Sequence, residues 1–222
     1  MYESLLRLPY FQGMSKNDIT SILDRVAFDF VKYCNGDVIC KHGNKCNSIL
    51  ILVQGRMHCV AESPHEEYTL IEDINAPYAI EPHSMFGYSA CYNRDYTADG
   101  HCTILAIEKK FLFSELTRHD IFTINFLNLI SSRSQKQENL IWEQTPGSIA
   151  GRIYRFISSR CELQHGRKRV SIKMETLAAI LCETRLNISK CLNEMQNSGI
   201  VELHRKEIII PSLDKLAEYI KE

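Results

Sequence analysis

The side chains best suited to recognising another molecule in this sequence are hydrogen-bond donors clustered around residue 185. Arginine can hold O6 and N7 of a guanine through two parallel hydrogen bonds, and asparagine can do the same at N6 and N7 of an adenine. Both residue types occur at the start of a helix predicted over residues 185–197. The first residues of a recognition helix enter the major groove of DNA. We predict that the contacts to double-stranded DNA include Thr184, Arg185, Asn187, Ser189 and Lys190.

Basic residues on either side of this helix are candidates for binding the DNA backbone. Residues 167–169 read Arg-Lys-Arg, and residues 205–206 read Arg-Lys in the turn of a predicted hairpin. Lys and Arg that contact phosphate add affinity that does not depend on the base sequence. The alternative interpretation is a solvated surface on a module that binds proteins. The predicted phosphate contacts are Lys168, Arg169 and Arg205.

Two further helices are needed to position the helix at 185–197. Residues 148–161 place Ile and Phe three and four apart, which predicts an amphipathic helix, and residues 173–181 predict a second, shorter one. Thr184 is a good amino-terminal cap for the helix that follows, and Gly199 is suited to end it. The order helix, turn, helix is therefore predicted for this part of the chain.

A hairpin completes this module. The apolar runs 200–203 and 207–210 flank His204-Arg205-Lys206, and Pro211 ends the second run. A helix-turn-helix followed by a β-hairpin is a winged helix-turn-helix. We predict such a DNA-binding domain over residues 145–222.

The amino-terminal half carries a different pattern. Residues 4–27 predict helices, and from about residue 28 to 107 short apolar runs alternate with turn residues, among them Gln54-Gly55 and the loop at Pro64. Many short strands with regular turns indicate an antiparallel sandwich or barrel. We predict an α+β protein whose residues 1–108 form an antiparallel β-roll, a jelly roll, with sensor or effector function.

Residues 109–144 return to a helical period, with apolar residues three, four and seven apart. A long helix with an apolar stripe needs a cover. A second copy of the same helix, as in a parallel coiled coil, would supply one. Packing of the stripe on the chain's own β domain is the equal alternative. We predict one long dimerisation helix over residues 109–144.

Charge and composition limit the class of protein. The 222 residues carry a net charge of −1 and 45% apolar residues, which excludes a uniformly basic, histone-like coat for DNA and a wholly disordered chain. Residues 1–144 hold 13 Lys and Arg against 18 Asp and Glu, whereas residues 145–222 hold 13 against 9. This asymmetry suggests a basic module joined to an acidic one.

The sequence also bears on location. No run approaches the roughly 20 apolar residues that span a bilayer, and the first residues lack the basic charge of a signal peptide. We therefore expect a soluble, cytoplasmic protein without a membrane partner. Nine cysteines cannot all pair within the chain, so free thiols, many of them buried, are expected in a reducing compartment.

At residues 173–192 and 197–201 the chain resembles the bacterial cAMP receptor protein/fumarate-nitrate regulator (CRP/FNR) family of transcription factors. The resemblance extends to the order β-roll, long helix, winged helix-turn-helix. It implies a homodimer that reads a two-fold symmetric DNA site, bends the DNA, and contacts RNA polymerase if it activates transcription. Cys182 stands where the family has a turn glycine, and Leu186 replaces an acid in the recognition helix, so the family's best-known half-site is not expected.

The same resemblance places a candidate effector pocket in the β-roll, at Phe86, Gly87, Tyr88, Tyr96 and Thr97. Members that bind cyclic nucleotides carry a Glu two residues after the Phe and a later Arg, which hold ribose and phosphate. Here those positions are Tyr88 and Tyr96, so cAMP is not the expected signal. Tyr88, Tyr92 and Tyr96 either line a pocket for a less charged effector or, as we favour, belong to the core.

No cofactor and no metal are predicted. Residues 1–33 contain no cysteine, unlike iron–sulfur members of the family, and the spacing of Cys34, Cys40 and Cys46 is unlike metal-ligand motifs. A small-molecule effector, an iron–sulfur cluster, haem and thiol-based sensing stay open as alternatives. No phosphate-binding loop, nucleophile elbow or metalloprotease motif is found, so we do not expect an enzyme.

The sequence as a whole predicts a DNA-binding transcription regulator that acts as a homodimer on a two-fold symmetric site and responds through its β-roll to an unknown signal. The alternative is a ligand-binding or protein-binding β-roll with a degenerate helix-turn-helix. The sequence does not distinguish activation from repression.

Overall fold

The computed structural model describes residues 5–142 and 147–220. These residues form two compact units. The first consists of residues 5–58 and 74–138, and the second of residues 59–73, 139–142 and 147–220. Within the described residues no helix is long and apolar enough to cross a membrane.

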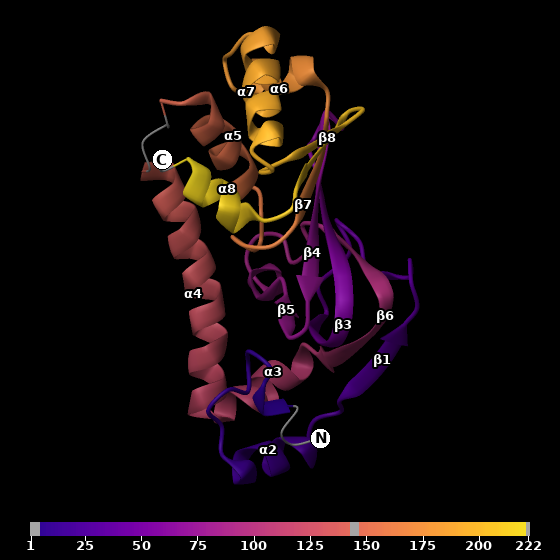
Figure 1. The fold of residues 1–222 in the computed structure, drawn as a ribbon. Coiled ribbons are helices and arrows are strands. Elements are labelled where there is room, and N and C mark those ends of the chain that lie inside the picture. The colour runs from indigo at the N-terminus through magenta and orange to yellow at the C-terminus, as the bar shows by residue number, and fades with distance from the viewer. Residues whose placement is uncertain (1–4, 143–146, 221–222) are drawn as a thin grey trace. The chain divides into compact units, whose positions relative to one another are not determined.

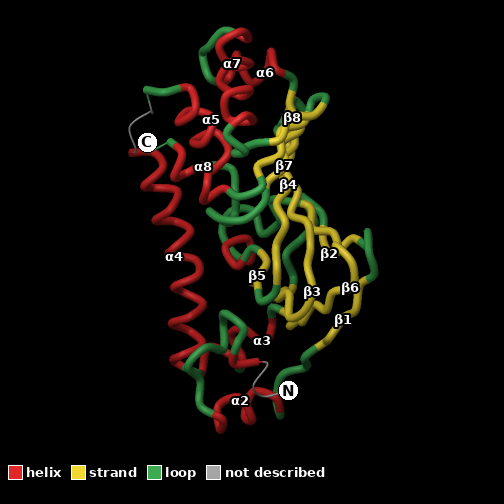
Figure 2. Tube along the Cα trace, in the orientation of Figure 1, coloured by secondary structure: helices red, strands yellow, loops and turns green. Residues whose placement is uncertain are grey.

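The first unit is built on antiparallel strands, drawn in yellow in Figure 2. The long strand β6 pairs with β1, placing Phe30 opposite Leu105, and with β2 near its start. Strand β3 lies beside β6 and pairs with β5. This arrangement confirms the predicted antiparallel β domain. The strands are β1 (Asp29–Tyr33), β2 (Val38–Cys40), β3 (Ser48–Glu62), β5 (Tyr78–Ile80) and β6 (Asp95–Glu108).

The turn predicted at Gln54-Gly55 is wrong, because both residues lie inside the single strand β3. Gly55 has a φ of +89°, and a Cβ built on it would lie 2.3 Å from the carbonyl oxygen of His101 on β6. The glycine is there because the two strands approach closely, and only glycine combines that approach with a positive φ.

Helices of the first unit pack through aromatic side chains. Tyr10 stacks on Phe122 and on Phe126, with ring centroids 5.7 and 6.0 Å apart. Part of the predicted apolar stripe therefore packs on the chain's own amino-terminal residues. The helices are α2 (Lys16–Leu23), η1 (Pro82–Met85), α3 (Lys110–Ser114), η2 (Leu116–Arg118) and α4 (Asp120–Trp142).

The single helix predicted over 109–144 is interrupted at residues 115–119. The long helix α4 begins only at Asp120. A second set of apolar residues on α4, Ile121, Ile124 and Leu127, is 38%, 55% and 53% exposed. The helix thus carries one apolar face that the chain covers and another that it leaves open to solvent.

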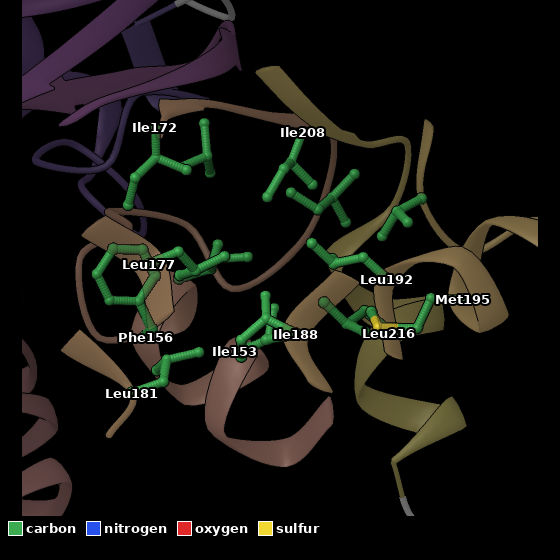
Figure 3. Close-up of a cluster of buried hydrophobic side chains, with 14 of the residues drawn as sticks. Ile153, Phe156, Ile172, Leu177, Leu181, Ile188, Leu192, Met195, Ile208 and Leu216 are labelled. Carbon is green, nitrogen blue, oxygen red and sulfur yellow. The ribbon is translucent and has the colours of Figure 1, made fainter. Parts of the chain in front are cut away.

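The second unit is the predicted winged helix-turn-helix (Figure 1). Strand β7 pairs with β9, and β9 pairs with β8 to form the wing. The helices pack around one apolar core, in which Ile188 and Leu192 of α7 and Ile153 of α5 are fully buried (Figure 3). The elements are α5 (Ile149–Ser158), β7 (Lys168–Ile172), α6 (Met174–Ile180), α7 (Arg185–Asn197), β8 (Glu202–His204), β9 (Glu207–Ile210) and α8 (Leu213–Tyr219).

The second unit also contains a segment from far away in the sequence. The end of β3 and most of β4 (Tyr68–Asn75), residues 59–73, belong to it. Strand β4 pairs antiparallel with β7, from Tyr68 opposite Ile172 to Glu72 opposite Lys168. The sheet of this unit therefore has the order β4, β7, β9, β8, with one strand from the amino-terminal half of the chain.

Candidate nucleic-acid interface

The turn between α6 and α7 has the geometry that a helix-turn-helix requires. Cys182 has a φ of +52°, the left-handed conformation that glycine adopts most easily. Thr184 caps α7, and its hydroxyl accepts a hydrogen bond from the backbone N–H of Asn187 at 3.2 Å. The cap predicted from the sequence is confirmed, and Cys182 fills the role of the missing glycine.

We expect Thr184→Ala to lower the free energy of unfolding of the second unit by about 1 kcal/mol, because the first turn of α7 loses its side-chain acceptor. It should also weaken DNA binding, since the fraying turn carries the predicted base contacts. Urea unfolding and a DNA titration check this. Ser212→Ala, which removes the analogous cap of α8, is the matched control. It should cost similar stability and leave DNA affinity unchanged; equal losses of affinity in both variants would contradict the prediction.

The amino end of α7 presents its polar side chains to solvent. Arg185 is 69% exposed, and its guanidinium forms an ion pair with Glu175 of α6 at 3.0 Å. Thr184, Asn187 and Lys190 are exposed and Ser189 is half-buried. The five residues predicted to contact DNA on this helix therefore form one accessible group, and the exposed Leu186 lies among them.

Glu183 anchors the turn to the rest of the unit. Its carboxylate accepts hydrogen bonds from the guanidinium of Arg152 on α5 and from the side-chain amide of Asn187. The hydrogen bond from Arg152 is the main cause of the lowered pKa of Glu183. Arg152 also donates to the carbonyl of Leu181 at 2.8 Å. Sequence reasoning missed both residues, because Arg152 lies on α5, 31 residues before Glu183, and no local pattern joins them.

A groove of about 300 Å³ separates the start of α7 from the wing. It is lined by cations on both sides, Arg185 from α7 and Lys206 from the wing turn, together with Lys173 at the start of α6. Lys206 was a candidate for binding the DNA backbone and Lys173 was not, and the two extend the basic surface from the recognition helix to the wing. Glu175 and Glu207 line the same groove, so its charge is mixed.

The predicted phosphate contacts divide into three cases. Arg205 is exposed in the wing turn. Arg169 is half-buried and forms an ion pair with Asp73 at 3.6 Å. The predicted phosphate contact of Lys168 is wrong, because this residue is completely buried and its ammonium binds the carboxylate of Glu72. Its position on β7 places its side chain on the same face as Val170 and Ile172, which are buried.

The residues of the predicted effector pocket differ widely in exposure. Tyr88 is fully exposed, whereas Tyr96 is fully buried, so the interpretation as core holds for Tyr96 and is wrong for Tyr88. Phe86 packs edge-on against Phe126 and at a tilt against Phe113, and the exposed Gly87 follows it. Thr97 is half-buried on β6, opposite Val38.

Residues of this region form hydrogen bonds to the carboxylate of a buried residue, Glu81. Glu81 is buried, and one of its carboxylate oxygens accepts hydrogen bonds from the hydroxyl of Ser84 at 2.5 Å and from the backbone N–H of Asn93 at 2.8 Å. The other oxygen accepts from the hydroxyl of Tyr96 at 3.4 Å. His83 lies 3.9 Å away. Sequence reasoning missed Glu81, which nothing in the local pattern distinguishes.

Metal and thiol chemistry were left open by the sequence. In the part of the chain that the structure describes, no group of three or more His, Cys, Asp or Glu residues is arranged to hold a metal ion. All nine cysteines are free thiols, and Cys40, Cys46, Cys59, Cys102 and Cys161 are buried.

Comparison with known proteins identifies the second unit. Residues 150–219 match the family model of the Crp-like helix-turn-helix domain. A "CRP-like cAMP-activated global transcriptional regulator" of Mycobacterium tuberculosis is 20% identical over 228 aligned residues, which cover 98% of each chain. The chain therefore contains a Crp-like helix-turn-helix domain and is similar to CRP-like regulators along its length.

Two solved structures of this kind share the fold. The catabolite activator protein of Thermus thermophilus is 15% identical, and the alignment covers 96% of this chain and 98% of that one with a TM-score of 0.51. The sensor domain of the regulator DNR from Pseudomonas aeruginosa is 16% identical, with 62% and 96% covered and a TM-score of 0.50. These structures show the shared fold. The family model over residues 150–219, together with the M. tuberculosis relative, supports a CRP-like transcription regulator with a helix-turn-helix DNA-binding domain.

Proposed function

We propose that this CRP-like regulator acts as a homodimer that inserts the amino end of α7 from each copy into successive major grooves of a two-fold symmetric DNA site. The observation that carries the proposal is the accessible group of donors on the capped start of α7. Arg185 and Asn187 suit guanine and adenine edges, while Leu186 suits the methyl group of thymine. Arg205 and Lys206 would bind phosphate from the wing.

The exposed face of α4 supports the homodimer. Ile121, Ile124 and Leu127 lie on one side of the helix, and apolar side chains at such spacing are typical of helix pairs. A second copy of α4 would bury this face, and two-fold symmetry would present two identical recognition helices. Half-sites one turn of DNA apart, about 34–36 Å, then follow from the docking geometry.

Glu81 supports a signal other than cAMP. A phosphate is held by backbone N–H groups and cations, but here the N–H group of Asn93 and the hydroxyls of Ser84 and Tyr96 already bind the Glu81 carboxylate. A second anion beside Glu81 would be repelled. Arg94, half-exposed, is the only arginine between residues 81 and 100. The proposed β-roll therefore senses something other than a cyclic nucleotide, in a cytoplasmic regulator that contacts RNA polymerase if it activates transcription.

The proposal is tested by titrating random-sequence duplex DNA between about 50 and 200 mM salt. Affinity should fall steeply as salt rises. Lys190→Gln should reduce the magnitude of the salt slope by about 2, because each copy of the homodimer loses one phosphate contact. Lys215→Gln, an exposed lysine on α8, is the matched control and should leave the slope unchanged. Absence of DNA binding at low salt, or equal slopes in both variants, would refute the proposed docking.

A further inference from the structure

The segment 59–73 adds a strand to the sheet that carries the wing. Strand β4 covers the edge of β7 over five residue pairs, and the opposite edge of β7 pairs with β9. Leu70 of β4 is buried in the core of the second unit, beside Val170 and Phe156. Without β4, the N–H and C=O groups along one edge of β7 would be unpaired. The segment is thus a structural part of the DNA-binding unit.

A buried ion pair fixes this strand in register. Glu72 and Lys168 lie opposite each other, both are 0% exposed, and their charged atoms are 2.9 Å apart. The Glu72 carboxylate also accepts hydrogen bonds from the backbone N–H groups of Glu162 and Leu163, at 2.6 and 3.1 Å. The ammonium of Lys168 donates to the carbonyl of His165 at 2.8 Å. A shift of β4 by one residue would turn Glu72 to the other face and leave Lys168 buried without its counter-charge.

The start of β4 is held by a second set of contacts. The guanidinium of Arg160, just beyond α5, donates to the hydroxyl of Tyr68 at 2.8 Å and lies 4.2 Å from the ring centroid of Phe156. The rings of Tyr68 and Phe156 pack edge to face at 5.2 Å. The strand is therefore attached at both ends, to the loop after α5 by Glu72 and to α5 itself by Tyr68.

Strand β7, to which β4 is attached, connects directly to the DNA-binding elements. Strand β7 ends at Ile172, and α6, the first helix of the helix-turn-helix, begins at Met174. The partner of β7 on its other side is β9 of the wing. At the other end of the segment, β3 and β4 continue into the first unit as unbroken strands. A movement of these strands would reach β7 through main-chain hydrogen bonds.

We propose that residues 59–73 are a docking strand that transmits the state of the first unit to the DNA-binding unit, with the pair Glu72–Lys168 as its latch. When the strand is docked, β7 holds the wing and α6 in the conformation seen here. When the first unit draws the strand away, Lys168 loses its counter-charge and β7 loses one edge partner, so the wing and α6 loosen. The effect on DNA affinity rests on the function proposed above.

The test uses the full chain with Glu72→Gln, which keeps the shape of the side chain and removes its charge. Asp73→Asn, which weakens the half-exposed pair with Arg169 one residue along the strand, is the matched control. Hydrogen exchange of β7 and of β9, which does not touch residue 72, should accelerate at least about tenfold in Glu72→Gln and less than about threefold in Asp73→Asn. Affinity for a random-sequence duplex should change at least about tenfold in the first variant only.

Each outcome decides the matter. Unchanged exchange in β7 and β9 would refute the latch. Accelerated exchange with wild-type DNA affinity would refute its role in transmission, whereas a wild-type protein that binds no DNA would refute the proposed function and leave the exchange result standing. If Glu72→Gln does not fold, Glu72→Asp serves in its place, because it keeps the charge and only draws the carboxylate back. It should show the same pattern with smaller changes, and wild-type exchange in β9 would overturn the proposal.

Discussion

Lys168→Met should lower the free energy of unfolding of the second unit by about 3–5 kcal/mol, the cost of leaving a buried charge without its partner. Methionine matches the apolar stem of lysine, so packing beside Val170 is kept. The Glu72 carboxylate, however, remains 0% exposed with only backbone N–H groups to neutralise it. A loss of this size is a large fraction of the stability of a domain.

The double variant Glu72→Leu with Lys168→Met separates the pair from its surroundings. Replacing both members of a buried pair by apolar residues is often neutral or stabilising. The free energy of unfolding of the double variant should therefore be higher than that of the wild type, or lower by no more than about 1 kcal/mol. Urea unfolding followed by circular dichroism measures both variants. Arg169→Gln, in the half-exposed pair with Asp73, is the control and should cost less than about 1 kcal/mol. A loss below 1 kcal/mol for Lys168→Met would mean that the pair does not hold the strand.

The winged helix-turn-helix was predictable because its signals are local. The cap at Thr184, the apolar spacing of Ile188 and Leu192, and the position of Gly199 each act within one or two turns of chain. The accessible face of α7 follows from the same period, since residues between the buried positions must point outward. The predicted contacts on this helix were therefore found on one surface.

The docking strand was not predictable in this way. The pairing of β4 with β7 joins residues about 100 positions apart, and no short-range pattern specifies it. One signal was nevertheless present. Lys168, Val170 and Ile172 occupy every second position of β7 and therefore share one face, so the pleat predicts that Lys168 points inward with the other two. A lysine at residue 168 suggested a surface contact. Its burial is made possible by the ion pair with Glu72, which lies in the other half of the sequence.

Gly55 and the break before α4 show the same limitation. Glycine in a sequence usually signals a turn. Gly55 is instead required by the close approach of β6, which is visible only in the folded sheet. Residues 109–144 keep a helical period through the break at residues 115–119, because a short irregular turn does not disturb the spacing of apolar residues. Tertiary contacts decide such details.

Ile124→Asp should convert the proposed homodimer into a monomer and reduce affinity for a two-fold symmetric site by about 10²-fold or more. Ile124 is 55% exposed in the single chain, so its replacement leaves the core of the first unit intact. In a symmetric dimer the change occurs twice, and two carboxylates would meet in an apolar seam. Loss of the dimer removes the high effective concentration of the second recognition helix, which is worth about 10²–10⁴ in affinity.

Sedimentation velocity and titration of a symmetric duplex and of a single half-site check this expectation. The variant should bind the half-site as the wild type does and lose only the gain from the second half-site. Gln137→Asp is the matched control, because it adds the same charge to an exposed position of α4 about 140° around the helix from Ile124. It should remain dimeric. If Ile124→Asp stays dimeric and binds with wild-type affinity, another surface joins the two copies. If the wild-type protein is a monomer and still binds the symmetric duplex more tightly than the half-site, the link between dimerisation and affinity is contradicted.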